Sequence, residues 1–232
     1  MTELRVYLPI TDLQPQFTAY LSTPLRGRGY PPLEGNHSLI IEVAPALAIH
    51  RIVDLALKKS PGMEPGILFT ERQFGLLELH SSDLSMIEDT GNAILHGIGA
   101  KAEDQLAPKI LFHDIIENIS DQHSIILNRS RDASILTPGV SLLIYEMQPA
   151  LFACVAANEA EKVAPNAIVN DIQMMGASGR IFMSGAIEDL RRAKDAITQI
   201  FSNVKGRSSL VTGNIIIEVS IMKMLQNLMT LF

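Results

Sequence analysis

The chain has 232 residues, of which 47% are hydrophobic and only 5% aromatic, and it contains no tryptophan. Its length suits one large or two small domains, whose cores must be built from Ala, Val, Ile, Leu and Met side chains. A formal net charge of −6 and a pI near 5.5 argue against a nucleic-acid partner, because binding to phosphates needs a clustered basic surface.

The remaining composition favours a cytoplasmic protein that does not enter membranes. The single cysteine, Cys154, lies in an alanine-rich pattern and cannot form an intramolecular disulfide, which predicts a buried, inert thiol in a reducing compartment. The first ten residues have neither a basic start nor a long apolar run, so they predict no ordinary signal peptide. No segment is long and apolar enough to predict a membrane span.

The chain contains an internal repeat, since residues 39–75 align without a gap with residues 143–179, 104 positions later. The matching pairs include Glu42 and Glu146, Pro45 and Pro149, Lys58 and Lys162, Pro61 and Pro165, and Gly75 and Gly179. This pattern indicates a tandem duplication. It predicts a first domain over residues 1–105, a second domain over residues 106–205, and a tail over residues 206–232 that belongs to neither repeat.

In chain order, each repeat is predicted to begin with a strand and a short helix. The evidence is that Asp12-Leu13 with Leu21 matches Asn118-Ile119 with Leu127 at an offset of 106. A strand follows over residues 38–43 or 141–147 and ends just before a proline, which favours the start of a helix.

The helix after each proline has one apolar face. That face carries Ile49, Ile52, Val53 and Ala56 in the first repeat, and Ala153, Ala156, Ala157 and Ala160 in the second. The alanines predict that the second helix packs very closely against a sheet.

Two strands and a second helix complete each repeat. The strands are expected over residues 66–70 and 76–80, and over 168–173 and 180–184. The helices are expected over residues 83–95, with Ser82 as the N-cap, and over 186–201. These elements predict an α/β (α+β, ferredoxin-like) fold with two tandem domains. In the tail, a polar stripe of Ser220, Lys223, Asn227 and Thr230 predicts an amphipathic helix over residues 215–232.

The two repeats differ most in the loop before the shared glycine. Residues 70–74 read Thr-Glu-Arg-Gln-Phe, whereas residues 174–178 read Met-Met-Gly-Ala-Ser. Because loops on a rigid scaffold usually carry function, this difference points to the loop as a functional site. The small loop before Gly179 completes no dinucleotide or Walker pattern, although its backbone N–H groups could contact an anion.

No motif predicts catalysis, a cofactor or a metal site. His80-Ser81-Ser82-Asp83 holds the letters of a catalytic triad, but consecutive residues cannot adopt triad geometry, and a helix start explains them better. His113-Asp114 with Asp121-x-His123 is the only acidic cluster with imidazoles in the sequence, and its spacing matches no common metal motif.

Several motifs resemble bacterial microcompartment shell domains. They are Asp54-x-x-x-Lys58, the run Asn158-Glu159-Ala160-Glu161-Lys162-Val163-Ala164, and the loop Gly176-Ala177-Ser178-Gly179-Arg180. Together with Glu71-Arg72-x-x-Gly75, they are most similar to the tandem, circularly permuted shell proteins of carboxysomes. The resemblance covers about residues 3 to 200.

The resemblance implies a structural role in the carboxysome shell, not an enzyme. Three chains would form a ring of six similar domains, two such trimers could stack, and other carboxysome shell proteins would be neighbours. Glu71 and Arg72 would gate a central pore, and Lys58 and Lys162 would lie at the edges of the tile. The pore loops would consist of Gln73, Phe74 and Gly75 in one repeat and Gly176, Ala177, Ser178, Gly179 and Arg180 in the other.

Small anionic metabolites would pass such a pore, since converging arginines create a positive field. The resemblance suggests ribulose bisphosphate, phosphoglycerate and bicarbonate. Two alternatives stay open from the sequence. One is a trimeric small-molecule sensor, and the other is a hydrolase that uses the histidines of the first repeat. Retained structure and assembly after changing His113 and His123, with no activity lost, would count against the hydrolase.

Overall fold

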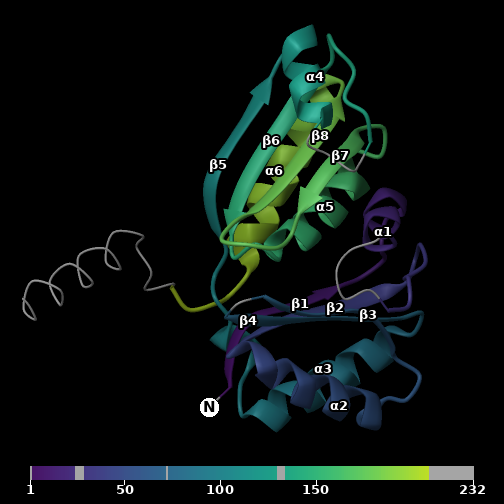
Figure 1. The fold of residues 1–232 in the computed structure, drawn as a ribbon, viewed down its shortest axis with the longest axis vertical. Coiled ribbons are helices and arrows are strands. Elements are labelled where there is room, and N and C mark those ends of the chain that lie inside the picture. The colour runs from purple at the N-terminus through teal and green to yellow at the C-terminus, as the bar shows by residue number, and fades with distance from the viewer. Residues whose placement is uncertain (1, 24–28, 72, 130–133, 209–232) are drawn as a thin grey trace, which may run out of the picture.

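The computed structural model describes residues 2–23, 29–71, 73–129 and 134–208. Its core is two antiparallel sheets of four strands, each with a layer of helices on one face (Figure 1). The tail predicted to form a helix over residues 215–232, and Arg72 of the predicted gate, lie outside the described residues.

The first sheet has the strand order β1-β2-β4-β3, and helices α2 and α3 cover one of its faces (Figure 1). Its elements are β1 (Glu3–Ile10), α1 (Pro15–Leu21), β2 (His37–Ala44), the 3₁₀ turn η1 (Ala46–Ala48), α2 (Ile49–Lys59), β3 (Glu64–Glu71), β4 (Phe74–Ser81) and α3 (Leu84–Ile98). Every neighbouring pair is antiparallel, and β2 is connected to β3, on the other side of β4, by a crossover through α2.

The second sheet repeats this order as β5-β6-β8-β7, with α5 and α6 on one face. Its elements, after the 3₁₀ turn η2 (Ala102–Asp104), are β5 (Lys109–Ile116), α4 (Asp121–Arg129), β6 (Ser141–Gln148), α5 (Phe152–Val163), β7 (Ile168–Gln173), β8 (Gly179–Gly185) and α6 (Ile187–Asn203). The two tandem domains and their mixed α/β fold are thus as the repeat predicted.

The strand and short helix that open each repeat are confirmed, and so is their offset of 106. Asp12 and Asn118, which the offset pairs, both have a positive φ, of 56° and 51°. Asp and Asn tolerate this left-handed conformation better than other residues with a side chain. The next residues make matching bonds: the N–H of Leu13 donates to the carbonyl of Asn36 at 2.8 Å, and that of Ile119 donates to the carbonyl of Val140 at 3.0 Å.

The predicted N-cap of the third helix is wrong by one residue. Helix α3 begins at Leu84, so Asp83 and not Ser82 is its N-cap, and the Asp83 carboxylate accepts a hydrogen bond from the Ser85 N–H at 2.9 Å. Hydrogen bonds from Ser85 lower the pKa of Asp83. Two polar residues in a row left the sequence ambiguous, and the extended backbone at Asp83 decides between them.

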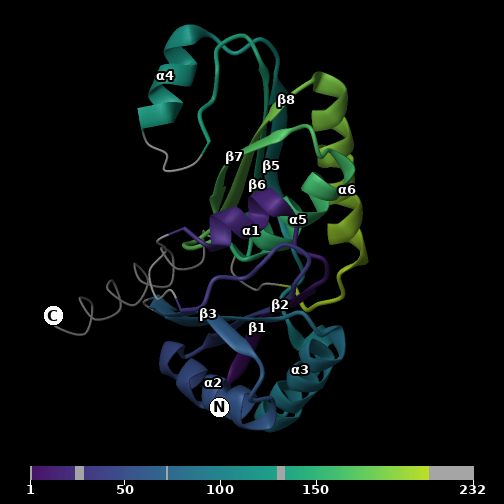
Figure 2. The same ribbon diagram turned by 90° about the vertical axis from the view of Figure 1, so that its right-hand side faces the viewer.

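Helix α5 lies between the two sheets (Figure 2). Its predicted alanine stripe is completely buried. Cys154 of α5 belongs to the same apolar cluster as Val6, Leu8 and Ile40 on the face of the first sheet opposite α2 and α3, which we call the outer face. This burial raises the pKa of the Cys154 thiol, as expected for an inert cysteine. Small side chains let α5 pack against both domains at once.

The chain returns to the domain junction after α6. The N–H of Ala107 donates to the carbonyl of Arg207 at 2.9 Å, and the Arg207 guanidinium contacts the Asp104 carbonyl and the Glu3 carboxylate. We propose a boundary after residue 105 on this basis, since the second sheet begins at Lys109. No helix in the described ranges combines the length and apolarity that a membrane crossing requires.

The two glycines shared by the repeats occupy the same close contact. A Cβ atom on Gly75 would lie 2.2 Å from the carbonyl oxygen of Ala46, and one on Gly179 would lie 2.2 Å from that of Ala150. Both carbonyls follow a cis proline, Pro45 or Pro149. A side chain at either glycine would therefore separate the start of β4 or β8 from the preceding turn.

We expect the substitution Gly179→Ala to lower the free energy of unfolding by about 1–3 kcal/mol, because the new methyl group must displace backbone. Urea denaturation measures the change. Gly97→Ala is the matched control, since its Cβ would meet the movable end of the Leu55 side chain and lies in a helix. Equal stability of Gly179→Ala and the parent chain would contradict this account of the glycine.

Candidate functional site

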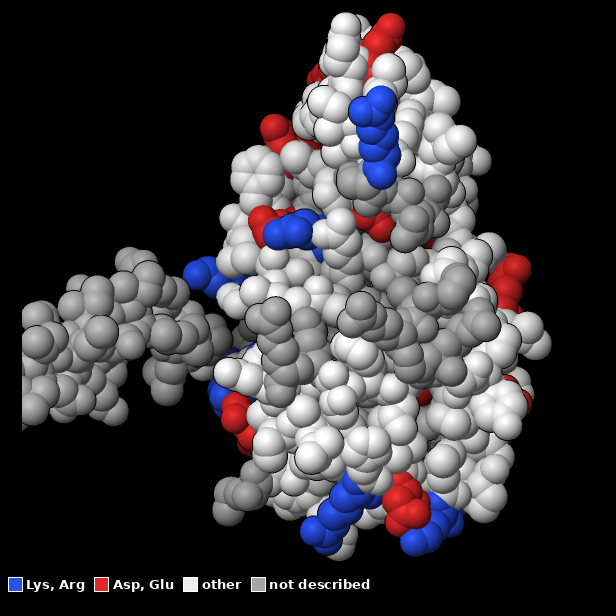
Figure 3. All heavy atoms as spheres, in the orientation of Figure 1, with Lys and Arg blue, Asp and Glu red and all other residues white. Residues whose placement is uncertain are grey.

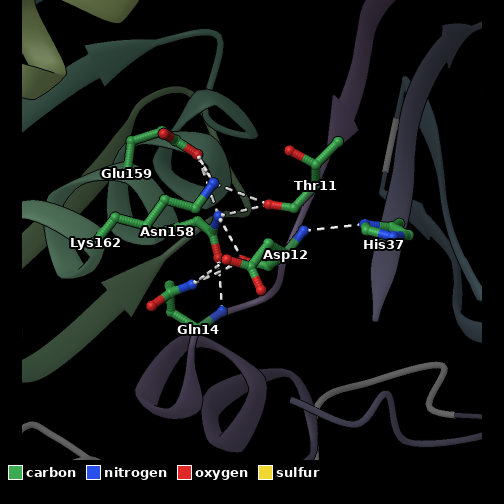
Figure 4. Close-up of polar contacts among 7 residues, drawn as sticks. All are labelled: Thr11, Asp12, Gln14, His37, Asn158, Glu159 and Lys162. Carbon is green, nitrogen blue, oxygen red and sulfur yellow. Dashed lines mark hydrogen bonds and ion pairs between the residues drawn. The ribbon is translucent and has the colours of Figure 1, made fainter. Parts of the chain in front are cut away.

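A polar joint connects α5 of the second domain to the turn before α1 of the first (Figure 4). The buried amide of Asn158 accepts a hydrogen bond from the Gln14 N–H at 2.9 Å and donates to the carbonyls of Thr11 and Asp12, each at 3.4 Å. The Lys162 ammonium donates to the Thr11 carbonyl at 2.9 Å. One helical face of α5 thus binds the backbone of one turn.

The Glu161 carboxylate caps α1 from the other domain. Its two oxygens accept hydrogen bonds from the backbone N–H groups of Gln16 at 2.8 Å and Phe17 at 3.0 Å. Helix α1 needs this contact, because its own N-cap residue, Gln14, makes no side-chain cap. Glu161 is only 3% exposed, and burying a carboxylate is costly unless it is hydrogen-bonded. The N–H groups of α1 therefore provide the donors that the buried carboxylate needs, and the carboxylate provides the acceptor that these N–H groups need.

The side chain of Gln16 fastens α1 to the edge strand of the second sheet. It donates to the Ala167 carbonyl at 2.9 Å and accepts from the Val169 N–H at 2.8 Å. Together with Glu161, this contact fixes both the position and the direction of α1 against the second domain.

The matching helix of the second repeat, α4, supplies its own cap. The Ser120 hydroxyl, at the position of Gln14, accepts a hydrogen bond from the His123 N–H at 3.3 Å. At the position of Glu161, helix α2 carries Leu57. The duplication has therefore diverged: α1 is completed by the second domain, whereas α4 caps itself.

The sequence pointed to the Asn158–Lys162 run, but it missed what the run binds. Lys162 contacts Thr11 of the same chain and pairs with Glu159 at 2.7 Å. Its counterpart Lys58 is exposed and pairs with Asp54 at 2.7 Å. A position at the tile edge stays a prediction for both lysines. Glu161 was not singled out, although its replacement by Leu57 in the sister helix was a visible signal.

The predicted pore loops lie in equivalent turns, β3–β4 and β7–β8. In the first, the Arg5 guanidinium lies 3.6 Å from the centroid of the Phe74 ring and donates to the Glu42 carboxylate at 2.8 Å. Gln73 is exposed and Gly75 is buried. Arg72 is outside the described residues, so the arrangement of the predicted Glu71–Arg72 gate stays a prediction.

In the second turn, the matching glutamate is bound by different partners. Glu146 accepts hydrogen bonds from Ser178 at 2.6 Å and from Arg180 at 3.0 Å, and these contacts lower its pKa, that from Ser178 most. Ala177 is held through its carbonyl by Gln148 at 3.1 Å, and Gly176 adopts a positive φ of 112°. The small loop is thus tied down mainly by hydrogen bonds.

The arginine that binds each of these glutamates comes from a different strand in each repeat. Arg5 is on β1 and corresponds to Leu111 on β5, whereas Arg180 is on β8 and corresponds to Leu76 on β4. Each repeat therefore has one arginine that binds this glutamate, but the arginine is on the first strand of the first repeat and on the last strand of the second. This exchange preserves a charged pair at the base of each loop while its surroundings differ.

The described residues provide no metal cluster, and one face of the molecule shows no basic patch (Figure 3). No group of three or more His, Cys, Asp or Glu side chains among the described residues is placed to hold a metal ion. His113 of the predicted acidic cluster stacks on Tyr145, with ring centroids 5.2 Å apart. On the face drawn in Figure 3, the described Lys and Arg side chains are scattered and form no continuous patch.

Comparison with known proteins identifies relatives of the whole fold. Residues 4–104 match the family model described as the CsoS1D N-terminal domain. The chain is 37% identical over 207 residues to the carboxysome shell protein CcmP of Synechococcus elongatus, covering 88% of this chain and 94% of that protein. It is 36% identical to the carboxysome shell protein CsoS1D of Prochlorococcus marinus, covering 87% of this chain and 78% of that protein.

Two solved structures resemble the chain over nearly its full length. A double-ringed trimeric shell protein from the RMM microcompartment is 56% identical, with a TM-score of 0.87 and coverage of 90% of this chain and 100% of that one. A fused permuted hexameric shell protein from the RMM microcompartment is 39% identical, with a TM-score of 0.83 and coverage of 89% and 100%.

Replacing Glu161 by Ala leaves the first N–H groups of α1 without their acceptor. We expect the free energy of unfolding to fall by about 2–3 kcal/mol, the cost of losing hydrogen bonds to a charged group. Hydrogen exchange should become faster at the amides of Gln16 and Phe17. The matched control Ser120→Ala should affect only α4; unchanged exchange in α1 of Glu161→Ala would refute the assigned cap.

Proposed function

The chain belongs to the family of tandem-domain microcompartment shell proteins that includes CcmP and CsoS1D, and from this premise we propose that three chains form a ring of six domains that serves as a tile of the shell. It is a structural shell protein, as its named relatives are, and not an enzyme.

One observation supports the ring. Each domain has an outer sheet face and a helical surface, and within the chain only the outer face of the first sheet and the helical surface of the second domain are in contact. Helix α5 covers the outer face of the first sheet. The equivalent face of the second sheet carries Phe112, which is 53% exposed, where the first sheet carries Val6 at 0%. On the helix side, Leu47 before α2 is 72% exposed, whereas its counterpart Leu151 before α5 is 0% exposed.

The two uncovered surfaces complement one another across chains. If α2 of one chain covers the second sheet of another, the same contact repeats from chain to chain. A contact of this head-to-tail kind closes into a ring when its rotation allows. The trimeric, double-ringed state of the relative that is 56% identical supports closure at three chains and a stacked pair of rings.

The compartment we propose is the carboxysome, because the curated relatives are carboxysome shell proteins. A specific observation favours a second candidate, since the solved relative with 56% identity comes from the RMM microcompartment. Isolation of shells from the native cell and identification of their enclosed enzymes decides between the two. Ribulose bisphosphate carboxylase in the core supports the carboxysome, and its absence supports the second compartment.

A gated pore on the ring axis follows from the family resemblance of the two loops. Three copies of the Glu71–Arg72 loop and three of the small Gly176–Arg180 loop would surround it. An exposed Glu–Arg contact contributes only about 0–1 kcal/mol, so three of them leave an open and a closed form both accessible. The arginines favour small anions such as ribulose bisphosphate, phosphoglycerate or bicarbonate.

Light scattering coupled to gel filtration should give the mass of three or six chains, and electron micrographs should show rings of threefold symmetry. A stable monomer at micromolar concentration would rule out the tile. Saturable metabolite binding without assembly of the rings into sheets would instead favour the trimeric sensor.

The double substitution of Glu71 and Arg72 by Ala should leave the free energy of unfolding within about 0.5 kcal/mol of the parent, because gate side chains that project into a pore would make no contacts with the packed core. The pore should then be open in every ring seen by cryo-electron microscopy. The control removes an exposed ion pair, Glu188 and Arg191 on α6, and should not alter the pore. A pore that stays sealed in the double variant would place the gate in other residues.

A further inference from the structure

The joint within the chain has a counterpart whose parts lie on separate surfaces. The turn before α4 has the same backbone as the turn before α1, with Glu117 at the position of Thr11 and Ser120 at that of Gln14. Helix α2 carries Asp54 where α5 carries Asn158, and it keeps the lysine as Lys58. The chain therefore contains two helices and two turns that could form such a joint. Within one chain, however, only α5 is joined to a turn, the one before α1.

Transferring the observed bonds to these counterparts defines the second joint. Lys162 donates to the carbonyl of Thr11, so the equivalent contact would bring Lys58 of one chain to the backbone of Glu117 in the next, beside an exposed carboxylate. Asn158 accepts from the N–H of Gln14, so Asp54 would accept from that of Ser120. Both side chains are available, since those of Lys58 and Asp54 are 76% and 61% exposed.

Apolar residues packed at the joint are also replaced by polar or charged residues in its counterpart. On the sheet, Leu8 is replaced by the exposed Asp114. On the helix, Cys154 and Val155, both buried in the apolar cluster that includes Leu8, are replaced by the exposed His50 and Arg51. A basic group therefore appears on the helix where an acidic group appears on the sheet, which is complementary charge.

We propose that the contact between chains repeats the polar joint within each chain with an additional ion pair, in which Lys58 of one copy pairs with Glu117 of the next. This inference rests on the proposed ring. Complementary charge raises the rate of correct association and disfavours wrong partners. At the position where the joint within the chain has Thr11, the second copy supplies the carboxylate of Glu117.

The test is a charge exchange followed by analytical ultracentrifugation at low and high salt. We expect Lys58→Glu and Glu117→Lys each to raise the dissociation constant of the trimer by about tenfold or more at low salt. The double variant Lys58→Glu with Glu117→Lys should regain most of the affinity, which a merely misfolded chain could not do. The matched control Arg191→Glu, on the exposed side of α6, should assemble like the parent.

Each outcome separates this inference from the ring itself. If the parent chain is a trimer and both single variants assemble equally well, the charged joint is wrong and the ring stands. If trimers persist but no longer form sheets of tiles, Lys58 lies at the tile edge and the inference is again overturned. If no variant and no parent chain forms a trimer at any salt concentration, the proposed ring fails as well.

Discussion

The capping of α1 by Glu161 is the contact on which the arrangement of the two domains depends. Backbone N–H groups at a helix start need acceptors, and a buried carboxylate needs donors. Here the donors belong to one domain and the acceptor to the other. Asn158 and Lys162, on the same face of α5, hold the preceding turn, so three side chains of one helix orient the entire first domain.

The alanine content of α5 is the apolar side of the same constraint. A helix that packs against its own sheet and against a neighbouring sheet has no free face, and large side chains on both faces would keep the sheets apart. Helix α2, at the equivalent position, buries only one face, formed by Ile49, Ile52 and Ala56. The alanine-rich composition of α5 thus reflects contact with two sheets, and the single apolar face of α2 reflects contact with one sheet within the chain.

Much of the fold could be predicted because the repeat reports the same elements twice. The strands and the helices occur where the alignment placed them, and the paired residues Asp12 and Asn118 share a positive φ. The shared glycines at the starts of β4 and β8 were also visible, although the reason for them, a close backbone carbonyl, was not. The N-cap of α3 was missed because neighbouring Ser82 and Asp83 are both capable of capping.

The contacts between domains could not be predicted from periodicity. Periodicity gives the buried face of a helix against its own sheet, but Glu161 and Lys162 look like ordinary solvated charges until the second sheet is placed. Their hydrogen-bond partners are backbone groups of Thr11, Gln16 and Phe17, and a contact with the backbone leaves no pattern in the amino-acid sequence. Divergence between repeats, such as Glu161 against Leu57, was the one available signal.

The central claim is that one joint, used within the chain, is used again between chains. A cryo-electron microscopy structure of the assembled protein tests it most directly. The account predicts that the outer face of the second sheet, around Phe112, is covered by α2 of a neighbouring copy, with Lys58 at the turn before α4. A ring in which this face is open to solvent, or is covered by another element, would contradict it.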